Sequence, residues 1–260
     1  MCQMQGSSYR LTCFEVWGGN GRVAHPVELP GLQGWVHSQP FGPDGLGGDV
    51  HYLSVCSKGM VSRIALADVA GHGRTASLVA ERLREVLHKH TDSWDQSALM
   101  RELSEAFHEG SVGVQFATAA VLGFYVQTSE LLFTYAGHPP ALWYRPAERS
   151  WDLLYGTTPH AVDVADLPVG LIPGTPYSQT AVQLGVTDVL VLYTDGVTET
   201  RDRTGNALGQ EGLLKIVRDA PLAPPAEFGQ ALISGLEAFR GSAPRRDDET
   251  VIVLRNEKVV

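Results

Sequence analysis

The chain has 260 residues, of which 43% are hydrophobic and 19% are charged, and its formal net charge is −9 at pH 7. A chain of this length can bury the core of one large domain or of two small ones. The acidic balance argues against a broad surface for nucleic acid or anionic membrane, because those partners are bound mainly by clustered Lys and Arg.

Apolar runs and turn residues predict the secondary structure. Two short runs rich in Val, Ile and Leu flank Lys58 and Gly59, which is typical of a β-hairpin. Further along, apolar residues recur at helical spacing in four segments, and the middle of the chain is rich in strand-like runs. In chain order we predict strands at 50–57 and 61–67, helices at 74–90 and about 94–109, strands within 116–126, 131–145, 177–184 and 189–193, helices at about 210–219 and 225–240, and a last strand at 250–255.

The arrangement of these elements indicates the fold class. Strands in hairpins with helices in pairs, in place of strict β-α-β alternation, favour an α+β layered sandwich over a doubly wound parallel sheet. Two stretches rich in Gly, Pro and Thr, 156–175 and 195–209, are predicted to be loops.

Cysteine usage and hydropathy predict the compartment. The three cysteines, Cys2, Cys13 and Cys56, show no metal-binding or redox spacing and are interpreted as free thiols in a reducing environment. The first residues lack the apolar stretch of a secretory signal, and no apolar run approaches the roughly 20 residues that span a bilayer. We therefore predict a cytoplasmic enzyme.

Acidic residues stand at the ends of the predicted strands. Asp49 precedes the first strand of the hairpin and Asp68 follows the second, so antiparallel pairing makes them neighbours. Asp195 follows the run at 189–193 in VLVLYTDG, and Asp247 with Asp248 precedes the last strand. Carboxylates gathered at the rim of an apolar sheet repel one another, and a divalent cation relieves that repulsion. An all-oxygen ligand set suits Mg²⁺ or Mn²⁺ better than zinc, and two such ions activate a water towards a phosphorus centre.

Other interpretations of these residues remain open. Each aspartate taken alone is explained equally well as a turn residue, and only their convergence favours a metal site. His72, between two glycines, is either a loop histidine without a chemical role or the proton donor to the leaving alkoxide. His138 precedes two prolines and is expected to fix a turn. Arg245 and Arg246 flank the last acidic pair, where they either neutralise it, contact substrate or, as we expect, are solvated charges.

Seven segments of the sequence stand in a fixed order. They are GGDVHY at 47–52, ADVAGHGRTASLVA at 67–80, FATAAVLGFY at 116–125, YAGHPPALWY at 135–144, LPVGL at 167–171, LVLYTDGVTETRDRTGNALG at 190–209 and RRDDETVIVLR at 245–255. This ordered set, which covers about residues 30–256, resembles the metal-dependent protein phosphatase (protein phosphatase 2C-like, PPM) family in its bacterial SpoIIE/RsbU-type branch.

The resemblance implies a fold and a metal centre. The implied fold is a four-layer α-β-β-α sandwich of two stacked, mainly antiparallel sheets flanked by helix pairs. The implied cofactors are two divalent cations, Mn²⁺ or Mg²⁺, at one end of the sheets. Asp68 would bridge the metals, Asp195 and Asp247 would complete the first, and the backbone carbonyl of Val69 would bind the second. Asp49 would lie beside them partly through water, and Asp248 would support its neighbour. Together with His72, the proton-donor candidate, Asp49 and Asp68 are the predicted catalytic residues.

The chain also departs from the family pattern. Only about 45 residues precede GGDV, too few for the separate sensor domain that many relatives carry. We predict an N-terminal extension at 1–29, with an added strand and loop, packed on a phosphatase domain at 30–260. The usual acid after the 116–126 strand is replaced by Gln127, Thr128 and Ser129. The arginine that holds phosphate in some eukaryotic relatives has no matching position.

The function implied by the resemblance is a protein-serine/threonine phosphatase that hydrolyses phosphoserine or phosphothreonine with metal-activated water. The habitual substrates of the branch are anti-anti-sigma factors in partner-switching pathways. Two alternatives stay open: a catalytically silent binding module of the same fold, and a hydrolase of small phosphoesters, which a deep apolar pocket at the site would favour. A phosphoprotein partner is expected, without nucleic acid or membrane, and a homodimer is left open.

Overall fold

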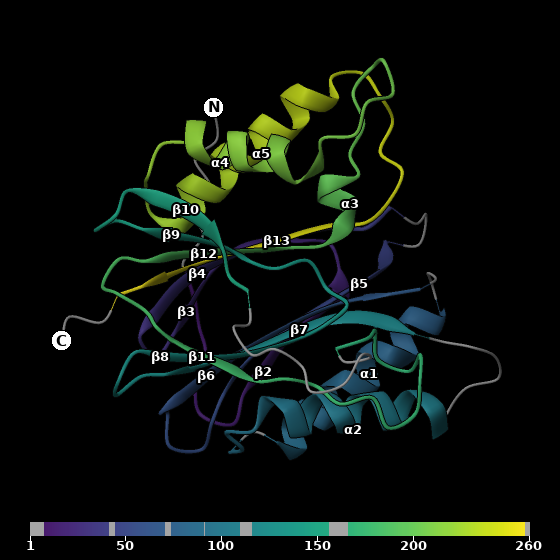
Figure 1. The fold of residues 1–260 in the computed structure, drawn as a ribbon, viewed down its shortest axis with the longest axis vertical. Coiled ribbons are helices and arrows are strands. Elements are labelled where there is room, and N and C mark those ends of the chain that lie inside the picture. Colours follow the sequence, from purple (N-terminus) through teal and green to yellow (C-terminus); the bar gives the residue numbers. More distant parts are fainter. Residues whose placement is uncertain are drawn as a thin grey trace.

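The computed structural model describes residues 8–41, 45–70, 74–90, 92–109, 116–155 and 166–257. Two β-sheets are stacked face to face, with α1 and α2 outside one sheet and α4 and α5 outside the other (Figure 1). The helices are α1 (Arg74–Lys89), α2 (Gln96–Glu109), α3 (Asp195–Thr198), α4 (Gly209–Asp219) and α5 (Pro225–Arg240). The strands are β1 (Tyr9–Arg10), β2 (Val16–Gly21), β3 (Val23–Leu29), β4 (Leu32–Gln39), β5 (Leu46–Val55), β6 (Val61–Val69), β7 (Ala117–Tyr125), β8 (Glu130–Ala136), β9 (Leu142–Arg145), β10 (Ser150–Leu153), β11 (Thr180–Gln183), β12 (Val189–Tyr193) and β13 (Glu249–Asn256).

The two sheets are mainly antiparallel. One has the strand order β1-β3-β4-β13-β12-β9-β10 and the other β11-β8-β7-β6-β5-β2. The pairing of β1 with β3 is parallel, and every other pairing between the named strands is antiparallel. The predicted α-β-β-α arrangement is confirmed, and so is the 50–67 hairpin, which forms β5 and β6.

Three apolar layers hold the four structural layers together. One lies between the sheets, one under α1 and α2, and one under α4 and α5. On β6, Ile64 and Leu66 belong to the layer between the sheets, whereas Ala65 and Ala67 belong to the helix-facing layer. Because both faces of such a strand are buried, it reads as a continuous apolar run and not as an alternating one.

The N-terminal segment is more integral to the sheets than the sequence indicated. We expected one added strand and a loop before residue 30, but this segment supplies β2, which pairs with β5, and β3, which pairs with β4. The predicted boundary between residues 29 and 30 falls in the turn of the β3–β4 hairpin. Strands of both sheets therefore come from this part of the chain.

The segment 195–209 also differs from its prediction as a loop. It begins with the single helical turn of α3 and contains an antiparallel bridge between Arg201 and Ala207. Four residues are too few to show helical periodicity, which explains why the sequence did not indicate α3. Of the other predicted loop, residues 156–165 lie outside the described part of the chain.

Candidate metal centre

Asp49 and Asp68 are direct cross-strand partners on β5 and β6. Side chains alternate along a strand, so Asp68 lies on the same face as Ile64 and Leu66, and Asp49 on the same face as Leu53. Both carboxyl groups therefore lie on the face of the sheet that packs against the apolar layer between the sheets. The sequence placed them just outside the strands, but both lie within them, because β5 begins earlier and β6 ends later than predicted.

A second pair of strand ends meets the first. β12 and β13 are antiparallel, and the N–H of Thr194 extends the pairing by donating to the carbonyl of Thr250 at 3.1 Å. Asp195 then begins α3, and Asp247 ends the connection from α5 to β13. Both carboxylates influence the pKa of Asp68 directly, and Asp195 is close enough to share a hydrogen bond with it. The predicted convergence of the strand ends is confirmed.

Burial makes negative charge unfavourable at this site. Loss of solvation, followed by the charges of Asp195 and Asp247, raises the pKa of Asp68 from 3.8 to about 7. Asp49 is 3% exposed, and its burial, followed by the charge of Asp68, raises its pKa well above the ordinary range. Burial also raises the pKa of Asp247. A bound cation would favour the ionised form of each group.

Asp49 is oriented by Thr194, a residue that the sequence analysis did not predict to be part of the site. The Thr194 hydroxyl donates to Asp49 Oδ2 at 2.7 Å, and the Thr250 N–H donates to the same hydroxyl at 3.1 Å. Thr194 is fully buried. No local pattern indicated this contact, because it joins residues 145 positions apart in the sequence.

Asp248 ties distant parts of the chain together. Its carboxylate accepts the backbone N–H groups of Phe41 and Gly48 through its two oxygens. A Cβ on Gly47 would lie 2.7 Å from Asp248 Cγ, and one on Gly196 would lie 2.0 Å from the Asp248 carbonyl oxygen. Both glycines are needed for this close approach, and Asp248 holds the backbone next to Asp49. Its expected support of the neighbouring Asp247 stays a prediction.

The donor set fits a hard divalent cation. The carboxylates supply oxygen ligands, which hard cations prefer. The main influences on the pKa of Asp68 all disfavour its negative charge, so a counter-ion would stabilise the ionised form. Among the residues that the structure describes, no group of three or more His, Cys, Asp or Glu side chains is already arranged to hold an ion. The acids are thus gathered at one end of the sandwich without being closed around a single point.

Two predicted site residues remain to be placed. Val69 is the last residue of β6, opposite Ala117, and follows Asp68 directly. Its place next to Asp68 is consistent with a backbone carbonyl that binds a cation at the same site, and this role stays a prediction. His72 lies outside the described residues.

The remaining charged and histidine positions are resolved by their contacts. His138 Nδ1 lies 2.8 Å from the hydroxyl of Thr118, and the histidine is buried at the turn after β8, which agrees with the expected role. Burial lowers the pKa of His138 to about 3, so its ring is neutral.

Arg245 was expected to be solvated, but its Nε donates to Glu249 Oε2 at 3.2 Å. Arg246 is exposed, as expected.

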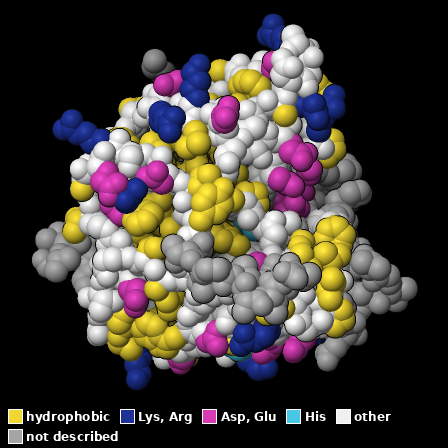
Figure 2. Space-filling view, in the orientation of Figure 1, with side chains coloured by type: hydrophobic (Ala, Val, Ile, Leu, Met, Phe, Trp, Pro, Cys, Tyr) yellow, Lys and Arg dark blue, Asp and Glu magenta, His cyan; other side chains and the backbone are white. Residues whose placement is uncertain are grey.

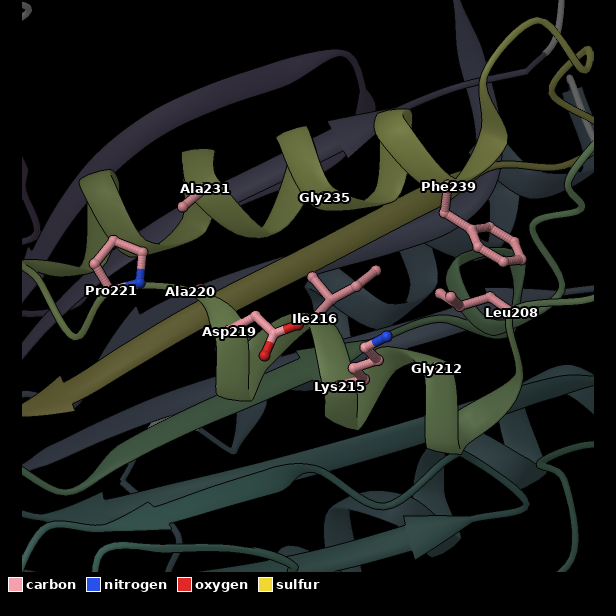
Figure 3. Close-up of a pocket in the computed structure, with 10 residues that line it drawn as sticks. All are labelled: Leu208, Gly212, Lys215, Ile216, Asp219, Ala220, Pro221, Ala231, Gly235 and Phe239. Carbon is pink, nitrogen blue, oxygen red and sulfur yellow. The ribbon is translucent and has the colours of Figure 1, made fainter.

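Two cavities differ in their relation to the acids. A polar cleft of about 210 Å³ adjoins Asp247. A larger cavity of about 520 Å³ lies between α4 and α5, where Figure 3 shows Ile216 and Leu208 facing Phe239 across the gap. The described residues that line this larger cavity do not include the clustered aspartates, so the apolar pocket and the acids are separate features.

Comparisons with known proteins agree with this geometry. The family model described as "Stage II sporulation protein E (SpoIIE)" matches residues 59–257. The chain is 25% identical over 196 residues to the phosphoserine phosphatase RsbP of Bacillus subtilis strain 168, which covers 74% of this chain and 45% of RsbP. The structure of the RsbU and RsbW domains of a Mycobacterium tuberculosis protein has a TM-score of 0.71 and 22% identity, covering 93% of this chain and 64% of that one.

A structure with bound metal has the same fold. The catalytic domain of the serine/threonine phosphatase PstP in complex with two manganese ions has a TM-score of 0.60 and 16% identity, covering 86% of this chain and 97% of that one. At these identities the solved structures show the fold alone, and they confirm the sandwich. The chain spans less than half the length of RsbP. No helix among the described residues is long and apolar enough to cross a bilayer.

Proposed function

Since the chain belongs to the SpoIIE family, we propose that it is a protein-serine/threonine phosphatase with two divalent cations, Mn²⁺ or Mg²⁺, as cofactors. The observation that carries the proposal is the position of Asp68, half-buried beside Asp195 and Asp247, where its pKa rises to about 7. Carboxylates held in this way demand a cation. The names of RsbP, a phosphoserine phosphatase, and of PstP with two manganese ions support the reaction and the metal.

Each acid has a proposed role that follows from its position. Asp68 lies centrally and would bridge the two ions, with Asp195 and Asp247 as further ligands of one ion. The carbonyl of Val69 would reach the other. Asp49, held by the Thr194 hydroxyl at 2.7 Å, would orient a water beside the ions.

The ions would lower the pKa of that water and neutralise charge on the phosphoryl oxygens. Asp49 is proposed to accept a proton from water, because a bound cation would hold its carboxyl in the ionised form that a general base requires. His72 is proposed as the donor to the leaving alkoxide. The hydrogen bond from Thr194 to Asp49 Oδ2 fixes the orientation of this carboxylate.

The substrate class is proposed from the shape beside the acids. The cavity adjoining Asp247 is a small polar cleft, whereas the large apolar cavity lies between α4 and α5. A polar site without a deep apolar pocket around it favours a phosphorylated protein over a small apolar phosphoester. An anti-anti-sigma factor in a partner-switching pathway is the proposed partner. The free thiols of Cys13 and Cys56 fit the reducing cytoplasm as the place of this reaction.

Phosphate release from a phosphoserine peptide and from an aryl phosphate, with and without Mn²⁺, tests the proposal. The wild-type chain should require the metal, and Asp68→Asn and Asp195→Asn should each lower kcat by about 100-fold or more. Asp219→Asn, an exposed aspartate of α4, is the matched control and should retain full activity. Activity that persists in both site variants would remove the mechanism. Calorimetry without Mn²⁺ binding would instead favour a silent binding module.

A further inference from the structure

The polar cleft beside Asp247 has a composition that the reaction itself does not require. One wall is α3 and the residues that follow it, and the other is the connection from α5 to β13. Four arginines, Arg201, Arg240, Arg245 and Arg246, are among the described residues that line it. Figure 2 shows acidic and basic side chains side by side on the upper right of the molecule, where α3 and the end of α5 lie in Figure 1.

Two of the arginines are hydrogen-bonded to one buried carboxylate, that of Glu249. Arg240 Nη2 donates to Glu249 Oε1, and Arg245 Nε donates to Oε2 of the same carboxylate at 3.2 Å. The Thr200 hydroxyl also donates to Glu249 Oε1 at 3.1 Å. The side chains of Arg240 and Glu249 are only 9% and 5% exposed. This buried network forms the floor of the cleft and fixes the backbone that carries Arg246.

The other two arginines are exposed at the cleft. Arg201 Nη1 donates to the Gly205 carbonyl at 2.7 Å. The loop below it is held by Asp202, which accepts the N–H groups of Thr204 at 2.8 Å and Asn206 at 3.0 Å. Arg201 is therefore presented on a fixed loop.

Arg246 forms no ion pair with the part of the chain that the structure describes. The acids that remain on the cleft are Glu199 and Asp247. Once Asp247 is engaged by a cation, as the proposed function requires, the two exposed arginines outnumber the single remaining carboxylate. The cleft then attracts an anion.

We propose that Arg201 and Arg246 form a subsite for the carboxylate of an Asp or Glu residue close to the phosphorylated residue of the protein substrate. This inference rests on the proposed phosphatase function. The planar guanidinium group pairs with a carboxylate through two parallel hydrogen bonds, which favours this ligand. The volume of about 210 Å³ is below the roughly 300–1,000 Å³ of typical small-molecule sites, and it suits a single side chain.

The test compares three substrates at equal Mn²⁺: a phosphoserine peptide with flanking glutamates, the same peptide with glutamines, and an aryl phosphate. Wild-type kcat/KM should be higher for the glutamate peptide, and the preference should shrink in high salt because exposed charges are screened. Arg246→Gln and Arg201→Gln should each lower kcat/KM for that peptide up to about fivefold, the ceiling for an exposed ion pair. The aryl phosphate should be unaffected. Arg218→Gln, on α4, is the matched control.

Three results would overturn the subsite, and they are distinguishable. Equal wild-type activity on both peptides would remove the preference while leaving the phosphatase function intact. An equal loss on all three substrates in the arginine variants would assign these residues to the reacting phosphoryl group. Absence of metal-dependent release from every substrate would overturn the proposed function and, with it, this inference.

Discussion

Replacing Asp68 with Asn should stabilise the metal-free protein at neutral pH. Burial, followed by the charges of Asp195 and Asp247, raises the pKa of Asp68 from 3.8 to about 7 in the folded chain. A carboxyl whose pKa is higher when folded contributes its full stability below pH 3.8, and that stability is lost as the pH rises towards 7. Asparagine has nearly the same shape and carries no charge to bury.

The size of the effect follows from the pKa change. A rise from 3.8 to about 7 corresponds to at most about 4 kcal/mol of unfolding free energy lost above pH 7. Because the asparagine amide must also be buried, we expect Asp68→Asn to be more stable than wild type by about 2 kcal/mol near neutral pH. That is a rise in Tm of roughly 4–8 °C for a chain of this size. At about pH 4 the difference should almost vanish.

Urea unfolding of EDTA-treated protein, followed by tryptophan fluorescence at about pH 4 and about pH 7.5, measures both differences. Mn²⁺ should then stabilise the wild type and not the variant, because a ligand stabilises only the state that binds it. Asp202→Asn is the control. Hydrogen bonds from Thr204 and Asn206 lower the pKa of Asp202 to about 2, so this variant should lose stability by a similar amount at both pH values.

The reasoning would be refuted by an Asp68→Asn protein that is less stable than wild type at neutral pH in the absence of metal. That outcome would mean that the Asp68 carboxylate is stabilised by contacts within the chain and does not require a cation.

Three further substitutions test the packing that positions the site. Gly229→Ala places a Cβ 2.2 Å from Trp35 Cε3, so it should cost about 1–3 kcal/mol, seen as a lower urea midpoint. Arg63→Met removes the buried donor to two carbonyls between α1 and α2 and should cost about 3 kcal/mol in the same assay. Glu249→Ala leaves the Arg240 guanidinium buried without its carboxylate and should cost about 3–5 kcal/mol, with an unchanged Tm as the contradicting result.

The elements that the sequence predicted are those whose signal is local. The β5–β6 hairpin and the two acids on it could be found because strand runs and turn residues lie within about 20 positions of each other. The antiparallel rule then placed Asp49 opposite Asp68. The geometry of the centre was thus accessible before its contacts were known.

The sequence predicted a single added strand before residue 30, where the structure has β1, β2 and β3, because the residues of this segment are poor strand formers. β2 contains Gly18 and Gly19, both with positive φ, and β3 contains Pro26. Gly18 is needed because a Cβ there would lie 2.0 Å from the His51 carbonyl oxygen. The structure of this segment depends on the close approach of β2 to β5. No local sequence pattern indicates that approach.

The contacts that orient the acids could not be predicted from the sequence for another reason. Thr194 reaches Asp49 across 145 positions of sequence, and Asp248 reaches Phe41 and Gly48 across 207 and 200. Propensity and periodicity act over one element, so they cannot pair residues of different sheets. Only the stacking of the two sheets brings these groups together.

Asp202 and Asp68 show how the two interpretations of an aspartate beside a turn can be separated within one chain. Asp202 accepts hydrogen bonds from its own loop, and its pKa falls to about 2, so its charge is satisfied by the protein. Asp68 is half-buried beside other carboxylates, and its pKa rises to about 7, so the surrounding protein disfavours its charge. Turn chemistry accounts for the first residue and not for the second. Folding places Asp68 where its ionised form is disfavoured, and this is the physical reason for our proposal that a ligand supplying positive charge belongs to the working state.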